Sequence, residues 1–192
     1  MTPITQLSQL DLNANYSYAD YLTWQLEETV ELIKGKIMAM SPAPNVKHQS
    51  ISRNMLVEIA NHLHKKPCKV FHAPFDVKLY DSHKSQLSDR EVFSVVQPDL
   101  CVIGNSETTP NWIIEVLTLG DNMKDVRLKF ELYQECHIRE YWIIHPYSQT
   151  VYQFVLNHED KYQLHAMYAG DDIATPYLFP ELKIDLADVF AE

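Results

Sequence analysis

The sequence predicts a single α/β domain with a central mixed β-sheet that is flanked by helices. The chain has 192 residues, enough for one domain with its own hydrophobic core. Apolar side chains recur every four positions over residues 48–64, the spacing of an amphipathic helix. Short apolar runs of strand length alternate with helical segments over much of the chain. Together these features favour a sheet with helices packed on it.

The first third of the chain is predicted to hold two helices and a hairpin between them. Ser17 is a suitable N-cap for the first helix. The Lys34-Gly35 pair separates two apolar runs and predicts a tight hairpin turn. On the second helix, Ile51, Met55 and Ile59 lie on one face. The expected elements are a helix over residues 18–27, strands over 30–33 and 36–40, and a helix over 48–64.

The remainder is predicted to add further strands, one long helix and a peripheral hairpin formed by the last two strands. The expected strands cover residues 69–72, 75–79, 95–103, 112–117, 140–144, 150–156 and 162–167. The long helix covers residues 122–136, and residues 184–190 are read as a short strand or a helical turn. Residues 1–15 precede the first element and are expected to be flexible.

Composition excludes several classes of protein. The net charge of −10 argues against an architectural nucleic-acid binder, which gains affinity from a basic surface. Only four glycines occur, each far from the next, so a glycine-rich phosphate loop of the P-loop or Rossmann type is disfavoured.

The expected location is the cytoplasm. The three cysteines have no C-x-x-C spacing, and Cys101 lies in an apolar run, so a reduced core thiol is favoured over a ligand or nucleophile. Residues 1–15 lack a basic region followed by an apolar stretch, so a secretory signal is not expected. The apolar runs are too short to span a bilayer.

Two carboxylates stand in apolar strands, where burial of an unpaired charge is costly. Asp99 lies in the run 95–103, and Glu115 lies in the run 112–117. On neighbouring strands about 5 Å apart, both could reach one hard cation such as Mg²⁺ or Mn²⁺. For either residue alone, a turn position after Pro98 or a solvent-facing edge position is the favoured alternative. For the pair, a shared metal site is favoured.

Lys129 is the third candidate residue. At 100° per residue it shares a helix face with Val126, Phe130 and Tyr133, the face that packs on the sheet. Lys124 and Arg127 point elsewhere and are predicted to be solvated. A lysine on the packing face needs an anionic partner, or else its stem packs while its ammonium reaches water. Its proximity in the chain to Glu115 favours a functional role.

Several stretches of the chain resemble the Uma-type endonucleases, a former domain of unknown function within the PD-(D/E)XK restriction-endonuclease-like superfamily. Pro98-Asp99, with Glu115 sixteen positions later, is similar to the superfamily signature. Other matching stretches spread over most of the chain: residues 31–37, Met40-Ser41-Pro42, His48, residues 115–117, Asp125, Lys129, Tyr133 and residues 139–142. The resemblance implies a restriction-endonuclease-like fold over residues 1–192.

The resemblance implies catalysis by Asp99, Glu115, Lys129 and Glu31, with metal held by the two carboxylates and by the backbone carbonyl of Val116. The chain departs from the superfamily pattern at Leu117, where a lysine is usual; Lys129 stands where this branch has its lysine. Residues 118–121 also differ from the Ser-Pro-Ser-like segment common in the family.

Four further residues are weighed as members of the site. Glu31 either supplies an acidic group or pairs with a lysine across the hairpin. His48 either faces the site, caps the helix or faces solvent. Asp76 and Gln97 are candidates for a supporting shell.

The predicted activity is hydrolysis of DNA phosphodiester bonds by a Mg²⁺- or Mn²⁺-dependent endonuclease. Two alternatives stay open: a nuclease-fold binding or interaction domain with weak or absent activity, and a hydrolase of small phosphoesters, which suits an acidic surface better than a long duplex. The predicted partners are DNA and a second copy of the chain, since a homodimer would pair two sites for double-strand cleavage.

Overall fold

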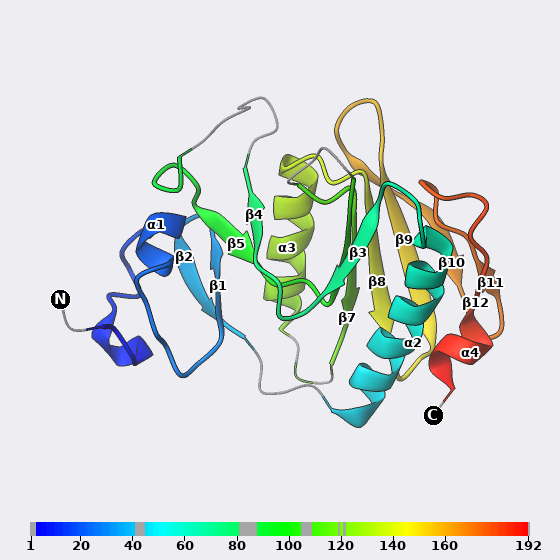
Figure 1. The fold of residues 1–192 in the computed structure, drawn as a ribbon, viewed down its shortest axis with the longest axis horizontal. Coiled ribbons are helices and arrows are strands. Elements are labelled where there is room, and N and C mark those ends of the chain that lie inside the picture. The colour runs from blue at the N-terminus through cyan, green and yellow to red at the C-terminus, as the bar shows by residue number, and fades with distance from the viewer. Residues whose placement is uncertain are drawn as a thin grey trace. The chain divides into compact units, whose positions relative to one another are not determined.

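The structure of the chain, a computed structural model, describes residues 3–40, 45–80, 88–104, 109–118, 120 and 122–191. It has the predicted mixed α/β composition, with a large mixed sheet (Figure 1). By its internal contacts the chain divides into two compact units, Met1–Pro42 with Asp76–Gln97, and Ala43–Phe75 with Pro98–Glu192.

The first unit contains a four-stranded antiparallel sheet in the order β2-β1-β5-β4. Its strands are β1 (Val30–Ile33), β2 (Lys36–Ala39), β4 (Val77–Leu79) and β5 (Ser94–Val96). The predicted hairpin is confirmed: Lys34 and Gly35 have φ values of 51° and 80°, which fit a type I′ turn. A small core of Leu32, Val92 and Val95 lies against aromatic side chains.

The predicted helix over residues 18–27 is wrong in its length. Ser17 caps it as expected, with its side chain accepting from the Asp20 backbone N–H, but α1 covers only Tyr18–Tyr21. Residues 22–23 form a turn, Trp24 then forms a parallel bridge with Ile4, and the Gln25 N–H donates to the Ile4 carbonyl at 2.7 Å. A 3-10 helix (η1) covers Leu7–Gln9 in the preceding segment. Contacts with the N-terminal segment therefore override helix propensity here.

The second unit contains a six-stranded sheet in the order β10-β9-β8-β7-β6-β3. Its strands are β3 (Lys69–His72), β6 (Leu100–Ile103), β7 (Trp112–Val116), β8 (Glu140–His145), β9 (Thr150–Leu156) and β10 (Tyr162–Tyr168). All neighbours are antiparallel except β7 and β8, which α3 (Met123–Glu135) connects as a crossover. The predicted β9–β10 hairpin is confirmed.

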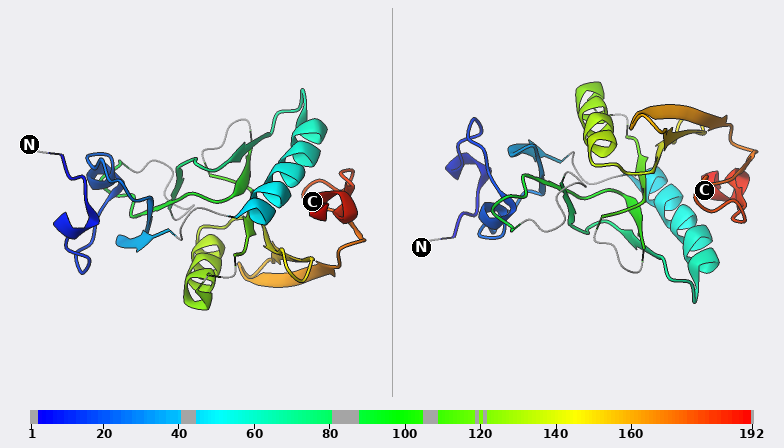
Figure 2. Two further views of the ribbon diagram at one scale, coloured as in Figure 1. Left: turned by 90° about the horizontal axis from the view of Figure 1, so that it is seen from below. Right: turned by 90° about the horizontal axis from the view of Figure 1, so that it is seen from above.

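Helices cover both faces of this sheet (Figure 2). On one face, α2 (Val46–Leu63) and α4 (Leu186–Phe190) pack in the main core with alternate residues of β6, β7 and β8. On the other face lies α3, whose Tyr133 packs on Tyr141 with ring centroids 5.0 Å apart. Residues 184–190 form both of the alternatives predicted for them, β12 (Ile184–Asp185) paired with β11 (Ile173–Ala174), and then α4.

The apolar run 95–103 is not one strand, contrary to its prediction. It is divided into β5 and β6, which belong to different sheets. Pro98 stands between them; its ring removes a backbone donor and restricts the residue before it, which interrupts a ladder.

Within the residues that the structure describes, no helix combines the length and the apolar character needed to cross a membrane.

Candidate active site

Asp99 and Glu115 lie at the same end of the neighbouring strands β6 and β7. Leu100 pairs with Ile114, so one further step in the antiparallel register sets Asp99, at the bend before β6, opposite Glu115. Glu115 lies on a central strand between β6 and β8 and is only 8% exposed, so it is not a solvent-facing edge residue. Asp99 follows Pro98 in a bend, and its side chain is 20% exposed.

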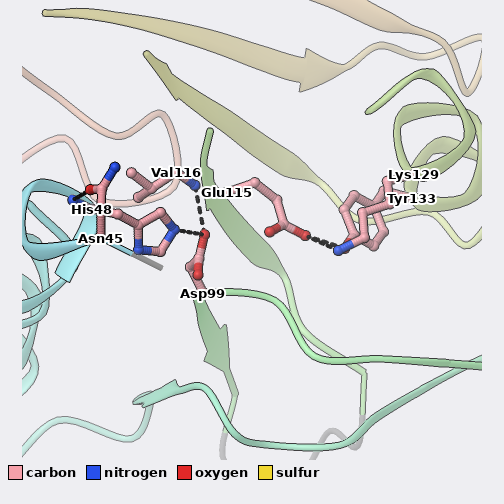
Figure 3. Close-up of polar contacts among 7 residues, drawn as sticks. All are labelled: Asn45, His48, Asp99, Glu115, Val116, Lys129 and Tyr133. Atoms are coloured by element: carbon pink, nitrogen blue, oxygen red, sulfur yellow. Dashed lines mark hydrogen bonds and ion pairs between the residues drawn. The ribbon is translucent and has the colours of Figure 1, made fainter. Parts of the chain in front are cut away.

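Asp99 is held from two sides through one oxygen, Oδ2 (Figure 3). The backbone N–H of Val116 donates to it at 2.8 Å, and Nε2 of His48 lies 3.2 Å away. His48 is 5% exposed and belongs to the first turn of α2, where the Asn45 side chain caps the helix by accepting from the His48 N–H at 2.9 Å. Oδ1 of Asp99 accepts no hydrogen bond from any residue that the structure describes. His48 therefore faces Asp99 rather than solvent, and Asn45 is the cap.

Glu115 is held from the other face of the sheet by two donors from α3. The hydroxyl of Tyr133 donates to Oε1 at 2.7 Å, and the ammonium of Lys129 contacts the same oxygen at 3.0 Å (Figure 3). Lys129 and Tyr133 are four residues apart on α3, so both point to one side of the helix. The Lys129 side chain is 17% exposed, so its ammonium meets an anion and does not extend fully into water.

The two other basic residues of α3, Lys124 and Arg127, lie where the helical spacing predicts. Lys124 is exposed, and the Arg127 side chain is 81% exposed and paired with Glu131 one turn on. The Asn122 side chain caps the helix by accepting from the Lys124 N–H at 3.0 Å. Lys129 is thus distinguished from its basic neighbours by its contact with Glu115.

The oxygen atoms at this end of β6 and β7 are of the chemical type that a hard divalent cation binds. The Leu117 N–H donates to Ile144 on β8, whereas the Val116 N–H donates to Asp99 on the β6 side. The N–H and C=O of one residue in a strand point to the same side, so the Val116 carbonyl also faces the β6 side. Two carboxylates and a carbonyl are ligands that Mg²⁺ and Mn²⁺ accept, with water or phosphate completing the shell.

No group of three or more histidine, cysteine, aspartate or glutamate side chains suited to a metal occurs among the described residues. A cation at Asp99 and Glu115 therefore depends on these two side chains together with backbone, water or substrate oxygens.

Glu31, Asp76 and Gln97 form a separate group within the first unit. Glu31, on β1, is 4% exposed, and its Oε1 accepts the backbone N–H of Gln97 at 2.8 Å. Its Cα partner across the hairpin is Met38. The Gln97 side chain donates to Asp76 at 2.8 Å, and the Tyr21 hydroxyl donates to the same oxygen at 3.2 Å. Burial, and next the charge of Asp76, raise the pKa of Tyr21 to about 12.

Cys101 is a buried thiol beside the site, as predicted. Burial, and to a lesser degree the charge of Glu115, raise the pKa of Cys101 to about 12. A thiol with a raised pKa is protonated at neutral pH and is a poor nucleophile.

Tyr133 was not predicted to be a site residue, although sequence spacing could have found it. It stands one helical turn beyond Lys129 on the packing face, so any anion that Lys129 reaches is also within range of a side chain at that position. From the sequence alone, a tyrosine at this position is expected to be a core aromatic. Only the structure shows that its hydroxyl also contacts Glu115.

Comparisons with known proteins agree with this fold. A model of the Uma2 family, described as "Putative restriction endonuclease", matches residues 18–187. A crystal structure described as a putative nuclease belonging to DUF820, from Anabaena variabilis ATCC 29413, is similar with a TM-score of 0.67 and 19% sequence identity. That similarity covers 91% of this chain and 97% of the other. No curated protein matches the chain.

Proposed function

This chain belongs to the Uma2 family, and we propose that it is a Mg²⁺- or Mn²⁺-dependent endonuclease that hydrolyses phosphodiester bonds of DNA. The observation that carries the proposal is the arrangement of Asp99 opposite Glu115, with Lys129 3.0 Å from the Glu115 carboxylate. A pair of carboxylates with one lysine is the set of groups that metal-assisted phosphoryl chemistry needs.

Each residue has a distinct role in this proposal. Asp99 and Glu115 hold the cation together with the Val116 carbonyl, and His48 fixes the orientation of Asp99. Bound there, the cation would polarise the scissile phosphate and lower the pKa of an attacking water. Lys129 stabilises the charge that develops on the phosphate in the transition state.

The group of Glu31, Asp76 and Gln97 in the first unit has a supporting role in the proposal. Glu31 is the third acidic residue assigned to the site. Its hydrogen bond with the Gln97 backbone supports a role in holding the segment that leads into Pro98-Asp99. The hydrogen bond from the Gln97 side chain to Asp76 also helps to hold that segment in place.

One observation favours a second candidate, hydrolysis of a small phosphoester. The net charge of −10 repels a long polyanion but tolerates a small one. The third candidate, a binding domain without activity, would use the same fold and differ only in having no turnover.

The experiment uses supercoiled plasmid DNA and bis(p-nitrophenyl) phosphate as two parallel substrates. We expect plasmid nicking with Mg²⁺ or Mn²⁺ that disappears in excess chelator and in Glu115→Ala, but not in Glu159→Ala, whose side chain is 74% exposed. Cleavage of the small ester alone would favour the second candidate, and no turnover of either substrate with intact folding would favour the third. Cleavage that persists in excess chelator would contradict the metal mechanism.

We also propose a cytoplasmic location and a homodimer. The three free cysteines support a reducing compartment. A dimer would pair two sites on one duplex. Light scattering coupled to size-exclusion chromatography measures the mass: about twice 22.3 kDa supports the dimer, and a single chain mass contradicts it.

A further inference from the structure

The two donors that share the Glu115 oxygen differ in how firmly they are held. The Tyr133 side chain is 0% exposed, and its ring packs on Tyr141 at 5.0 Å, so its hydroxyl has little room to leave. Lys129 contacts the same oxygen at the end of a flexible four-carbon stem and keeps 17% of its side chain exposed. One contact is thus built into the core, and the other can be exchanged.

The charges of the two donors differ as well. An ammonium so close to Glu115 is repelled by a divalent cation that approaches the same carboxylate, whereas a neutral hydroxyl is not. A substrate phosphate and the Glu115 carboxylate compete for the positive charge of the Lys129 ammonium, so the contact with Glu115 weakens when a phosphate binds. Loss of both contacts would remove the two α3 donors that orient the Glu115 side chain.

We propose that Tyr133 is a positioning residue whose hydroxyl keeps the Glu115 carboxylate oriented toward the cation, while the Lys129 contact is exchanged for the substrate phosphate. This inference rests on the proposed function, because it assigns Glu115 as a ligand. Figure 3 agrees with it: the second oxygen of Glu115 points away from Lys129, to the side of the view where Asp99 lies. Tyr133 would act through Glu115 without touching the substrate.

The test measures Mn²⁺ affinity by electron paramagnetic resonance in three variants of the full chain. Tyr133→Phe removes only the hydroxyl and is expected to weaken Mn²⁺ binding by about tenfold, at the lower end of the usual effect of losing a hydrogen bond to a metal ligand. Lys129→Ala is expected to change the affinity by no more than about twofold. If Tyr133 only packed in the core, removal of its hydroxyl would leave the Mn²⁺ affinity unchanged.

The matched control is Tyr162→Phe, another tyrosine packed around the α3 side of the sheet. Its ring lies 5.0 Å from Phe130, and its hydroxyl donates to the Ile138 carbonyl at 2.8 Å, with no contact to either carboxylate. It should bind Mn²⁺ like the wild type. Unchanged affinity in Tyr133→Phe, or an equal loss in Tyr162→Phe, would overturn the inference.

A metal-free measurement separates this inference from the proposed function. If the wild type binds no Mn²⁺, the proposed function fails, and crystal structures of the two variants without metal then decide the positioning role. Glu115 should keep its orientation in Lys129→Ala and turn in Tyr133→Phe. The reverse result, or an unmoved Glu115 in Tyr133→Phe, would overturn the role of Tyr133.

Discussion

Glu140 is the most deeply buried carboxylate of the second unit, and its replacement gives a large, calculable loss of stability. It is 0% exposed and accepts four hydrogen bonds. Trp142 and Gln153 donate from side chains at 2.7 Å each, and the backbone N–H groups of Tyr177 and Leu178 donate at 2.9 Å each. Glu140 thereby ties the segment after β11 to β8 and β9.

The magnitude follows from which donors lose their acceptor. Trp142 and Gln153 are both 0% exposed in the wild type, so in Glu140→Ala water cannot readily replace the lost acceptor. Each buried donor left without an acceptor costs about 1–3 kcal/mol, so the two together cost roughly 2–6 kcal/mol. Glu140→Gln keeps the shape and turns one acceptor oxygen into a donor that faces the Leu178 N–H, which costs about 1–3 kcal/mol. A typical domain is stable by only about 5–15 kcal/mol.

Urea unfolding followed by far-ultraviolet circular dichroism measures these losses. The expected order of stability is wild type, then Glu140→Gln, then Glu140→Ala. The surface control Glu159→Ala should stay within about 0.5 kcal/mol of the wild type. A Glu140→Ala variant equally close to the wild type would refute the reasoning, because the buried donors would then have found other partners.

Three further predictions address the site and the titratable groups. Lys129→Ala should slow DNA cleavage at saturating Mn²⁺ by roughly a hundredfold, because its charge acts on the transition state, while Lys124→Ala at an exposed position should do little; equal rates would contradict this role. Burial lowers the pKa of His145 below its usual 6.5, so protonation favours the unfolded chain. The free energy of unfolding, measured with urea, should therefore fall more steeply in the wild type than in His145→Gln as pH drops from 6.5 to about 5. An equal fall in the two proteins would count against this prediction. Of the three free cysteines only Cys68 is partly exposed, so a thiol reagent should label one site quickly in the native protein and the other two upon unfolding; rapid labelling of all three would exclude this arrangement.

Local patterns predicted most of the fold because they are set by residues close in sequence. The spacing of Ile51, Met55 and Ile59 describes the buried face of α2, and all three are buried. The positive φ values demanded by a two-residue hairpin are met at Lys34-Gly35. Where the prediction failed, contacts between residues distant in sequence determined the local structure. The backbone bond from Gln25 to Ile4 ends α1 early, and membership of two sheets divides the run 95–103 at Pro98.

The placement of the candidate site residues was predictable where it depended on helical or strand periodicity. Helical spacing placed Lys129 on the packing face of α3, and the structure shows its ammonium 3.0 Å from Glu115 on the strand that α3 follows. The partners of Asp99 were harder to predict from the sequence. The contact between His48 and Asp99 spans 51 residues of sequence and depends on how α2 lies on the sheet. The contact of Tyr133 with Glu115 was not predicted, because the same side chain serves as a core aromatic and as a hydroxyl donor.

The central claim is that Asp99 and Glu115 share a divalent cation, and Mn²⁺-soaked crystals test it most directly. Anomalous diffraction should give a peak within ligand distance of both carboxylates, with the Lys129 ammonium moved off Glu115. Crystals of Glu115→Ala soaked in the same way should lose the peak. Saturating Mn²⁺ that leaves the two carboxylates without a peak, or a peak that persists in Glu115→Ala, would contradict the claim.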